Sequence, residues 1–322
     1  MYSILDLKCE NDNYVGYKKI KKPSWLFDGN KKKVNILALG DVGASVLLGL
    51  RLLGGDVISK IGIYDQNDKL SSRYEIEMNQ VQYPWDYNCM PQVEAISIEH
   101  LFDCDIFVFC ATKGVPKVGC GIKDVRMAQF AANKDLVEAY AAMASECGFK
   151  GLFAVVSDPI EPLCKAALLK GNLNPDQIQG YGLGVMNARA AYYAQKYKKF
   201  SKFLNGGRVF GSHGEDLVVA DSIENYNDII SKELTNLTVE ANFKVRELGY
   251  KPYIAPAISS ATFGILQTIK GQYHYSSNYL NGIYFGAKNR TTPRGIEWEN
   301  LKLPKDLFDR IEEAYKNIEG II

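Results

Sequence analysis

Two side chains stand in segments that suit proton transfer and the recognition of a carboxylate. His213 lies in the glycine-flanked segment 211–214, and an imidazole that titrates near neutrality can give and take a proton. Arg189 follows Asn187 and Ala188 at the expected start of a helix. Its guanidinium can hold a carboxylate through two parallel hydrogen bonds. The alternative for His213 is a structural role, and for Arg189 a surface ion pair.

A second arginine and an amide share one expected helix. Arg126 and Asn133 are spaced so that both side chains fall on one face of that helix. The preceding stretch, residues 114–121, is interrupted by glycines and is expected to form a mobile loop over a site. A solvated position in the first helical turn is the alternative for Arg126.

The turn after the first expected strand has the spacing of a dinucleotide fingerprint. It reads Ala38-Leu39-Gly40-Asp41-Val42-Gly43, and a pyrophosphate would lie at the N-terminus of the following helix. Gly40 would let the backbone approach that group, and Gly43 would let the helix pack closely on the strand. Asp65, at the end of the next strand, would accept hydrogen bonds from the ribose and repel a 2′-phosphate, which predicts NAD. The alternative is a turn whose small residues serve packing only.

The elements that carry these residues alternate in a way typical of a parallel sheet. Ala111 and Val156, at the ends of two expected strands, are further candidates for contacting the cofactor. We expect an α/β protein with an N-terminal extension (1–32), a Rossmann-type NAD-binding domain (33–180) and a smaller α+β substrate domain (181–322). The expected strands are 34–39, 60–64, 105–110 and 152–156, and the expected helices are 44–53, 71–81, 124–146, 187–203, 223–248, 255–270 and 305–318.

Composition narrows the class of protein. The 322 residues are 47% hydrophobic and 23% charged with a net charge of +1, so there is no basic field for nucleic acid. The seven cysteines form no CxxC pair, which argues against a structural metal or disulfide framework. We find no run of 18 apolar residues and no signal-peptide core at the N-terminus. The expectation is a cytoplasmic protein without membrane or metal.

Together, five segments resemble the L-lactate/malate dehydrogenase family in their order and spacing. They are the nucleotide turn, the Arg126–Asn133 helix, residues 155–159, residues 187–189 and residues 211–214. The resemblance runs from about residue 33 through residues 253–257 to the C-terminus. It implies that His213 donates a proton to a substrate carbonyl, that Arg189 binds the substrate carboxylate and that Arg126 polarises the carbonyl. It also implies a homodimer or homotetramer, with helices 71–81 and 223–248 as contacts.

Two positions depart from the family at the heart of its chemistry. The family places an Asp three residues before the carboxylate-binding Arg, where this chain has Met186, and an Asn before Pro159, where this chain has Asp158. A thioether cannot support an imidazolium, and loss of the carboxylate from a His–Asp pair costs roughly 10⁴ in rate. Asp158 either caps the next helix or faces His213 and replaces the missing carboxylate. In the second case it would also favour a substrate that carries nitrogen at the reacting carbon.

Further departures alter the expected substrate pocket. Lys117 and Cys120 occupy the loop where the family reads its substrate, and Lys251 and Pro252 replace small or hydroxyl residues on another wall. Three hypotheses follow: a dehydrogenase of 2-oxo or 2-hydroxy acids, a reductase of 2-imino or opine-type substrates, and a non-catalytic NAD-binding sensor that uses residues 1–32. A glycosidase-like relative would need a Cys/His metal pair, which the spacing does not provide.

Overall fold

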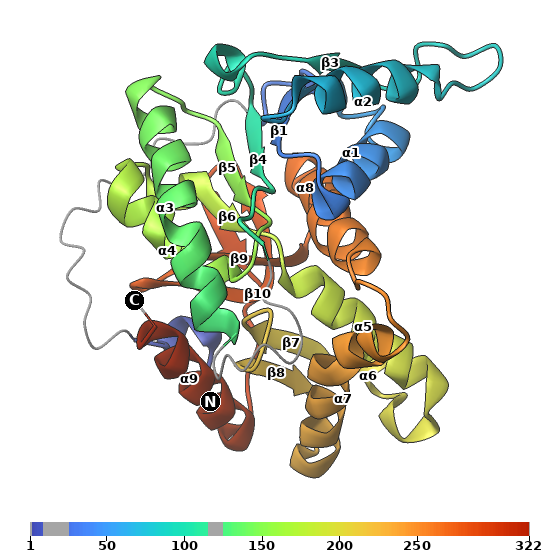
Figure 1. Cartoon of the computed structure of the whole chain (residues 1–322). Coiled ribbons are helices and arrows are strands. Elements are labelled where there is room, and N and C mark those ends of the chain that lie inside the picture. The colour runs from blue at the N-terminus through green and yellow to red at the C-terminus, as the bar shows by residue number, and fades with distance from the viewer. Residues whose placement is uncertain (1, 9–25, 115–124, 322) are drawn as a thin grey trace.

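The computed structural model describes residues 2–8, 26–114 and 125–321. Within them, one sheet of eleven strands runs through the molecule in the order β3-β2-β1-β4-β5-β6-β9-β10-β7-β8, with β11 paired to β10. Helices cover both faces of this sheet (Figure 1).

The first half of the sheet is parallel throughout. β4 and β5 are buried at every position, as expected for strands with helices on both faces, and their sequences are unbroken apolar runs. The strands are β1 (Lys32–Leu37), β2 (Ile58–Tyr64), β3 (Gln92–Ala95), β4 (Ile106–Phe109), β5 (Leu152–Val155) and β6 (Ile178–Gly180). The helices are α1 (Asp41–Leu53), α2 (Asp68–Gln80), α3 (Val125–Glu146) and α4 (Ile160–Gly171). The expectation of a Rossmann-type α/β fold is confirmed.

The second half continues the same sheet in antiparallel pairing. Gly180 of β6 pairs with Ser277 of β9, so hydrogen bonding passes from one half to the other. The strands are β7 (Arg208–Gly211), β8 (Leu217–Ala220), β9 (His274–Leu280), β10 (Ile283–Thr292) and β11 (Gly295–Trp298). The helical elements are α5 (Leu183–Lys196), α6 (Phe203–Gly206), α7 (Asp228–Glu247), the π-helical segment η5 (Pro256–Thr262), α8 (Phe263–Ile269) and α9 (Lys305–Glu319).

Several helices differ from the sequence-based expectation. α5 begins at Leu183 rather than at residue 187, so Arg189 lies in its second turn and does not open the helix. α7 begins at Asp228, where the Asn227 side chain accepts the Ile230 N–H, and not at residue 223. The helix expected over 255–270 contains the π-helical segment η5, whose Ser260 hydroxyl bonds into the start of α5.

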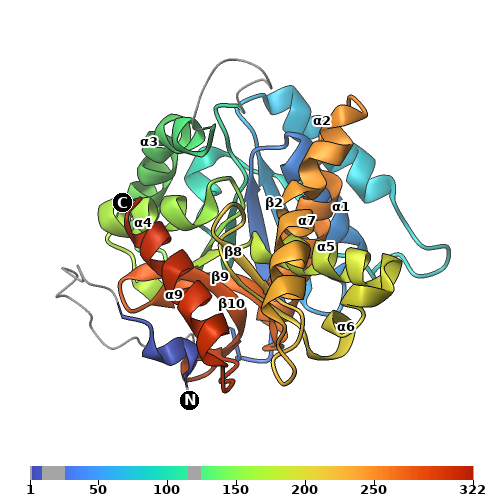
Figure 2. The same ribbon diagram turned by 90° about the horizontal axis from the view of Figure 1, so that it is seen from below.

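The structure describes both ends of the 1–32 segment, and each end packs against a different half of the molecule. Ile4 and Leu7 are buried in one hydrophobic cluster with Phe308 and Ile311 of α9, and the Tyr2 ring stacks on Phe308 at 4.6 Å. This brings the start of the chain beside α9, near the helix end that is opposite to the C-terminus (Figure 2). At the other end of the segment, Leu26 lies in the cluster that fills the space between α1 and the sheet.

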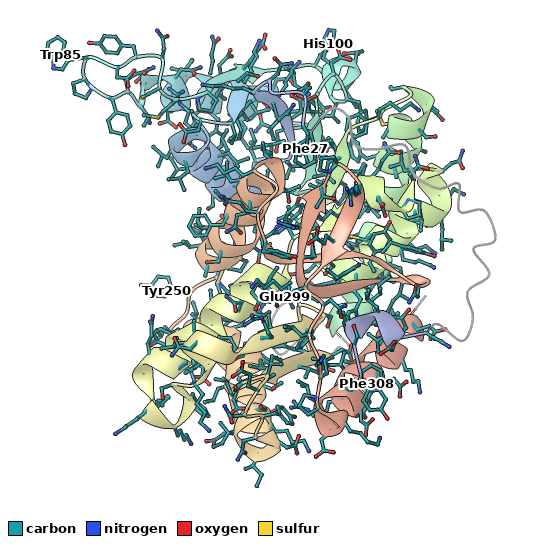
Figure 3. All side chains as sticks on the ribbon, turned by 180° about the vertical axis from the view of Figure 1, so that it is seen from behind. Phe27, Trp85, His100, Tyr250, Glu299 and Phe308 are labelled. Carbon is teal, nitrogen blue, oxygen red and sulfur yellow. The ribbon has the colours of Figure 1, made fainter. Side chains whose placement is uncertain are left out.

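A loop between α2 and β3 projects from the molecule and carries aromatic side chains. Trp85 is 91% exposed at its tip (Figure 3), and Tyr83 and Tyr87 are exposed on either side. The buried Arg51 guanidinium of α1 ties the end of α2 and the base of this loop to α1 by donating to the carbonyl oxygens of Met78, Val81 and Pro91. No helix among the described residues is long and apolar enough to span a bilayer.

Candidate functional site

The turn between β1 and α1 has the backbone shape that a dinucleotide requires. Ala38 has φ +72°, a conformation that costs an L-residue energy and that glycine adopts freely. A side chain on Gly43 would approach the Ala38 carbonyl oxygen to 2.0 Å, whereas a Cβ on Gly40 meets nothing within 4 Å. The helix therefore packs tightly on the strand at Gly43, and the backbone at Gly40 is open to a ligand.

Asp65 follows β2 and its carboxylate faces this turn. It accepts hydrogen bonds from the Leu39 N–H at 2.8 Å and from the Asn67 N–H at 3.0 Å. Each carboxylate oxygen keeps a free lone pair, so the group is held in place and can still accept from two ribose hydroxyls. The open backbone at Gly40 and the acceptor oxygens of Asp65 fit NAD.

His213 and Asp158 meet at the carboxyl edge of the sheet. The His213 Nδ1 lies 3.0 Å from the Asp158 Oδ1. The His213 side chain is only 8% exposed, while that of Asp158 is 45% exposed. The N-cap residue of α4 is Pro159, the residue after Asp158. The contact between Asp158 and His213 that the sequence left open is present in the structure.

Arg189 projects from α5 beside this pair. Its Nη1 contacts the Met186 Sδ at 3.4 Å and its Nη2 donates to the Asn242 Oδ1 on α7. Burial lowers the pKa of Arg189 to about 10, and the nearby Asp158 carboxylate acts in the opposite direction. Among the described residues, no carboxylate lies within ion-pair distance of this guanidinium. Its charge is therefore available to a carboxylate ligand.

Asn133 has a structural place that the sequence analysis did not foresee. Its buried side chain accepts from the Lys113 N–H at 2.9 Å and donates to the Asp158 carbonyl oxygen at 3.0 Å. The sequence predicts Asn133 as a substrate-binding residue; in this structure the amide is enclosed and fastens the loop after β4 to the loop after β5. It thereby holds the backbone of Asp158.

The structure describes the side chains of some of the remaining candidate residues and not of others. Arg126 lies in the first turn of α3, but its side chain, together with Lys117 and Cys120, lies outside the described residues. Ala111 and Val156 are buried at the ends of β4 and β5, and the Ser157 hydroxyl donates to the Ala111 carbonyl oxygen at 2.8 Å. Pro252 is half-buried in the segment before η5.

Sequence reasoning missed two contributors to the site. Asn242 orients Arg189 from α7, and Ser260 fixes the start of α5 through bonds to the Val185 N–H and the Gly182 carbonyl oxygen. Neither residue had a signal, because polar side chains on helices are ordinarily solvent-facing.

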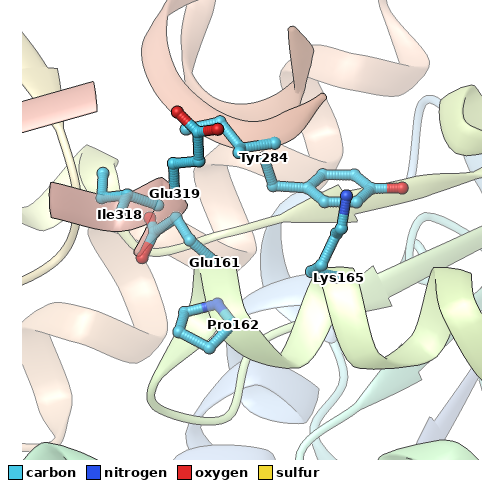
Figure 4. A pocket seen from close by; sticks show the side chains of 7 residues that line it. Glu161, Pro162, Lys165, Tyr284, Ile318 and Glu319 are labelled. Atoms are coloured by element: carbon cyan, nitrogen blue, oxygen red, sulfur yellow. The ribbon is translucent and has the colours of Figure 1, made fainter. Parts of the chain in front are cut away.

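Two cavities lie among the described residues, and neither is lined by His213. A small one, lined by Glu161, Lys165, Tyr284 and Glu319 among others, lies between α4 and α9 (Figure 4). A larger polar hollow lies beneath the aromatic loop and is lined by Arg51 and Tyr87 among others. Among the described residues, no three His, Cys, Asp or Glu side chains are grouped to hold a metal ion.

Comparison with known proteins identifies the architecture. No family model matches the chain. The L-lactate dehydrogenase of Mycoplasma mobile is 24% identical over 323 residues, which cover 92% of this chain and 97% of that protein. A lactate dehydrogenase from a Medee basin deep-sea metagenome library superposes with a TM-score of 0.75 at 16% identity, covering 91% of this chain and 98% of that one. The malate dehydrogenase of Archaeoglobus fulgidus, solved in complex with NADH, gives 0.72 at 16% identity, covering 90% and 98%.

The fold is thus that of the lactate and malate dehydrogenases. In sequence, the chain is similar to L-lactate and malate dehydrogenases at 24–25% identity.

Proposed function

We propose that this protein is an NAD-dependent dehydrogenase that interconverts a small 2-oxo acid and the corresponding 2-hydroxy acid. The observation that carries the proposal is the 3.0 Å contact between His213 and Asp158, which lies at the same edge of the sheet as the dinucleotide turn. Ligands of open α/β sheets bind at this edge. The division into a nucleotide-binding part (33–180) and a substrate-binding part (181–322) follows from the same proposal.

In this mechanism His213 is the acid and base. The Nδ1–H donates to Asp158, which leaves Nε2 as the atom that carries the proton to or from the substrate oxygen. The carboxylate holds the tautomer and stabilises the imidazolium, as an Asp does in other His–Asp pairs. A bound nicotinamide supplies or receives the hydride. Arg189 binds the substrate carboxylate, and Arg126 polarises the carbonyl.

Asp158 performs the role that Met186 cannot. The family's carboxylate would stand on α5, whereas here it comes from the loop after β5, which Asn133 fastens in place. Because one Asp is lost and another gained, the charge of the site is unchanged by the exchange. The site retains the balance that a carboxylate substrate requires.

NAD is the cofactor that the proposal assigns, with Asp65 on the adenosine ribose and Gly40 to Gly43 at the pyrophosphate. The relative from Archaeoglobus fulgidus was solved with NADH, which supports the assignment. We further propose a cytoplasmic homodimer or homotetramer. α2 and α7 carry the exposed apolar residues Ile76, Ile229 and Phe243, and light scattering at two concentrations tests this assembly.

A reductase of 2-imino substrates is the second candidate. The observation that favours it is the exposed carboxylate of Asp158 beside the proton donor, because a negative charge at this point stabilises a cationic iminium more than a developing alkoxide.

Oxidation of NADH with a panel of 2-oxo acids, each with and without ammonium or amino acids, separates these functions. Turnover with oxo acids alone supports the first proposal, and turnover only with an amine present supports the second. NADH binding without any turnover would contradict both and leave a non-catalytic sensor. Absence of NADH binding would contradict all three.

A further inference from the structure

An ion pair joins the second half of the chain to the start of α1. The Lys251 Nζ lies 2.9 Å from the Asp41 Oδ2. Asp41 is the first residue of α1, and Lys251 stands in the segment between α7 and η5, far along the chain. The side chains are 81% and 48% exposed, so the pair lies at the surface of the nucleotide turn rather than in the core.

Asp41 places a negative charge at a helix end where a bound diphosphate would also lie. The first N–H groups of α1 and its dipole favour a negative charge at this end, and the open backbone at Gly40 leaves space for one. The Asp41 carboxylate takes part of that favourable field and repels a diphosphate placed beside it. A cation that bridges the two anions would remove the conflict.

We propose that Lys251 binds the diphosphate of the dinucleotide, with Asp41 as the residue that positions its ammonium group. This inference rests on the proposed NAD-dependent function. An ammonium has three N–H donors. Asp41 takes one of them, and the others have no partner within the described chain. They are free to reach an anion on the open side of Gly40.

The same contact has a consequence for the substrate pocket. Lys251 precedes Pro252 and the π-helical segment η5, which packs against α1 and against α5, the helix that carries Arg189. A dinucleotide that engages Lys251 would hold this segment against the nucleotide turn. The dinucleotide and this wall of the pocket would then share one anchor.

Binding of ADP-ribose and of adenosine to the purified protein tests the proposal. Lys251→Gln should weaken ADP-ribose binding about tenfold, equivalent to about 1.4 kcal/mol, and leave adenosine binding unchanged because adenosine has no phosphate. Lys251→Arg should retain most of the affinity. Lys305→Gln, which removes an exposed lysine paired to Asp309 on α9, is the matched control and should bind as the wild type does.

The double variant Asp41→Asn with Lys251→Gln separates a direct contact from simple neutralisation. If Lys251 touches the diphosphate, the double variant remains weak for ADP-ribose. If Lys251 only cancels the charge of Asp41, the double variant recovers wild-type affinity and the proposal is wrong. Unchanged binding by Lys251→Gln also overturns it, while the NAD assignment stands. A wild-type protein that binds neither NADH nor ADP-ribose overturns both.

Discussion

Single residues decide whether the family reaction survives in this chain. His213 keeps a carboxylate partner only because Asp158 stands 3.0 Å from its Nδ1. We expect Asp158→Asn to reduce kcat about 10²- to 10⁴-fold, since the amide can neither stabilise an imidazolium nor fix the tautomer. The measurement is steady-state NADH oxidation with the best substrate of the panel.

The paired variant sharpens this test. Adding Met186→Asp to Asp158→Asn restores a carboxylate on α5 beside Arg189, and part of the lost kcat should return. Asp103→Asn is the matched control, because it breaks another His–Asp contact, at 2.7 Å to the exposed His100, and should not change kcat. Full activity in Asp158→Asn would contradict the assigned role.

At position 38, alanine is less favourable for the stability of the folded state than glycine would be. Its φ of +72° costs an L-residue about 1–2 kcal/mol, while glycine loses about 0.5–1 kcal/mol of entropy on folding. Ala38→Gly should therefore raise the free energy of unfolding by up to about 1.5 kcal/mol in urea denaturation. Ala44→Gly in α1 should lower it by about 1 kcal/mol, and a loss in both variants would exclude strain at Ala38.

At the scale of elements, Arg51 fastens the end of α2 and the base of the aromatic loop to α1. Its guanidinium donates to three backbone carbonyl oxygens. Two of these oxygens belong to Met78, in the last turn of α2, and Val81, directly after the helix. Arg51→Met should cost about 2–4 kcal/mol, because buried carbonyl oxygens lose a charged donor. Urea denaturation measures the loss, and limited proteolysis near Trp85 should accelerate.

An exposed arginine on α2 provides the comparison with Arg51 of α1. Arg73 pairs with Glu77 at 2.9 Å, and both side chains are exposed. Arg73→Met should change the free energy of unfolding by less than about 0.5 kcal/mol, since exposed ion pairs contribute little. Equal effects of the two substitutions would refute the anchoring role of Arg51.

Most elements could be predicted because their burial leaves a periodic pattern. The strands β1, β2, β4 and β5 appear as apolar runs, and α9 begins at residue 305 as expected. β3 and β6 had no such signal: Gln92–Ala95 contains two polar residues, and β6 has only three residues. The missed start of α5 has the same cause, since Gly182 and Gly184 resemble a loop but allow close packing against His213 and Ser259.

At the scale of the whole molecule, His274 couples stability to pH. It is buried between β6, β9 and α8, where its Nε2 lies 3.0 Å from the Thr268 Oγ1 and its Nδ1 3.0 Å from the Gln272 carbonyl oxygen. Burial lowers the pKa of His274 from 6.5 to about 4. The unfolded chain therefore takes up a proton as the pH falls below 6.5 while the folded state does not, and stability should decline until about pH 4.

The expected decline is on the order of 3 kcal/mol. The free energy of unfolding, measured by urea denaturation between pH 7 and pH 4, should fall less steeply with falling pH in His274→Gln than in the wild type. His100→Gln removes an exposed histidine and should leave the slope unchanged. An identical slope in His274→Gln would show that other groups control the acid sensitivity.

The site depends on contacts between segments that are far apart in the sequence, and these contacts could not be predicted. The resemblance identified His213 and raised Asp158 as a possible partner, but nothing in the sequence joined Lys251 to Asp41 or Asn242 to Arg189. These contacts depend on how η5 and α7 lie against α1 and α5. Spacing along the chain carries no information about such an arrangement.

The cluster that joins Ile4 and Leu7 to Phe308 and Ile311 of α9 has a consequence for folding kinetics. These two segments are separated by nearly the whole printed sequence. A contact of such long sequence separation must close a very large loop before it contributes to stability, and such contacts slow folding. The packing of residues 2–8 on α9 should therefore form late, after the sheet that lies between the two segments in the sequence.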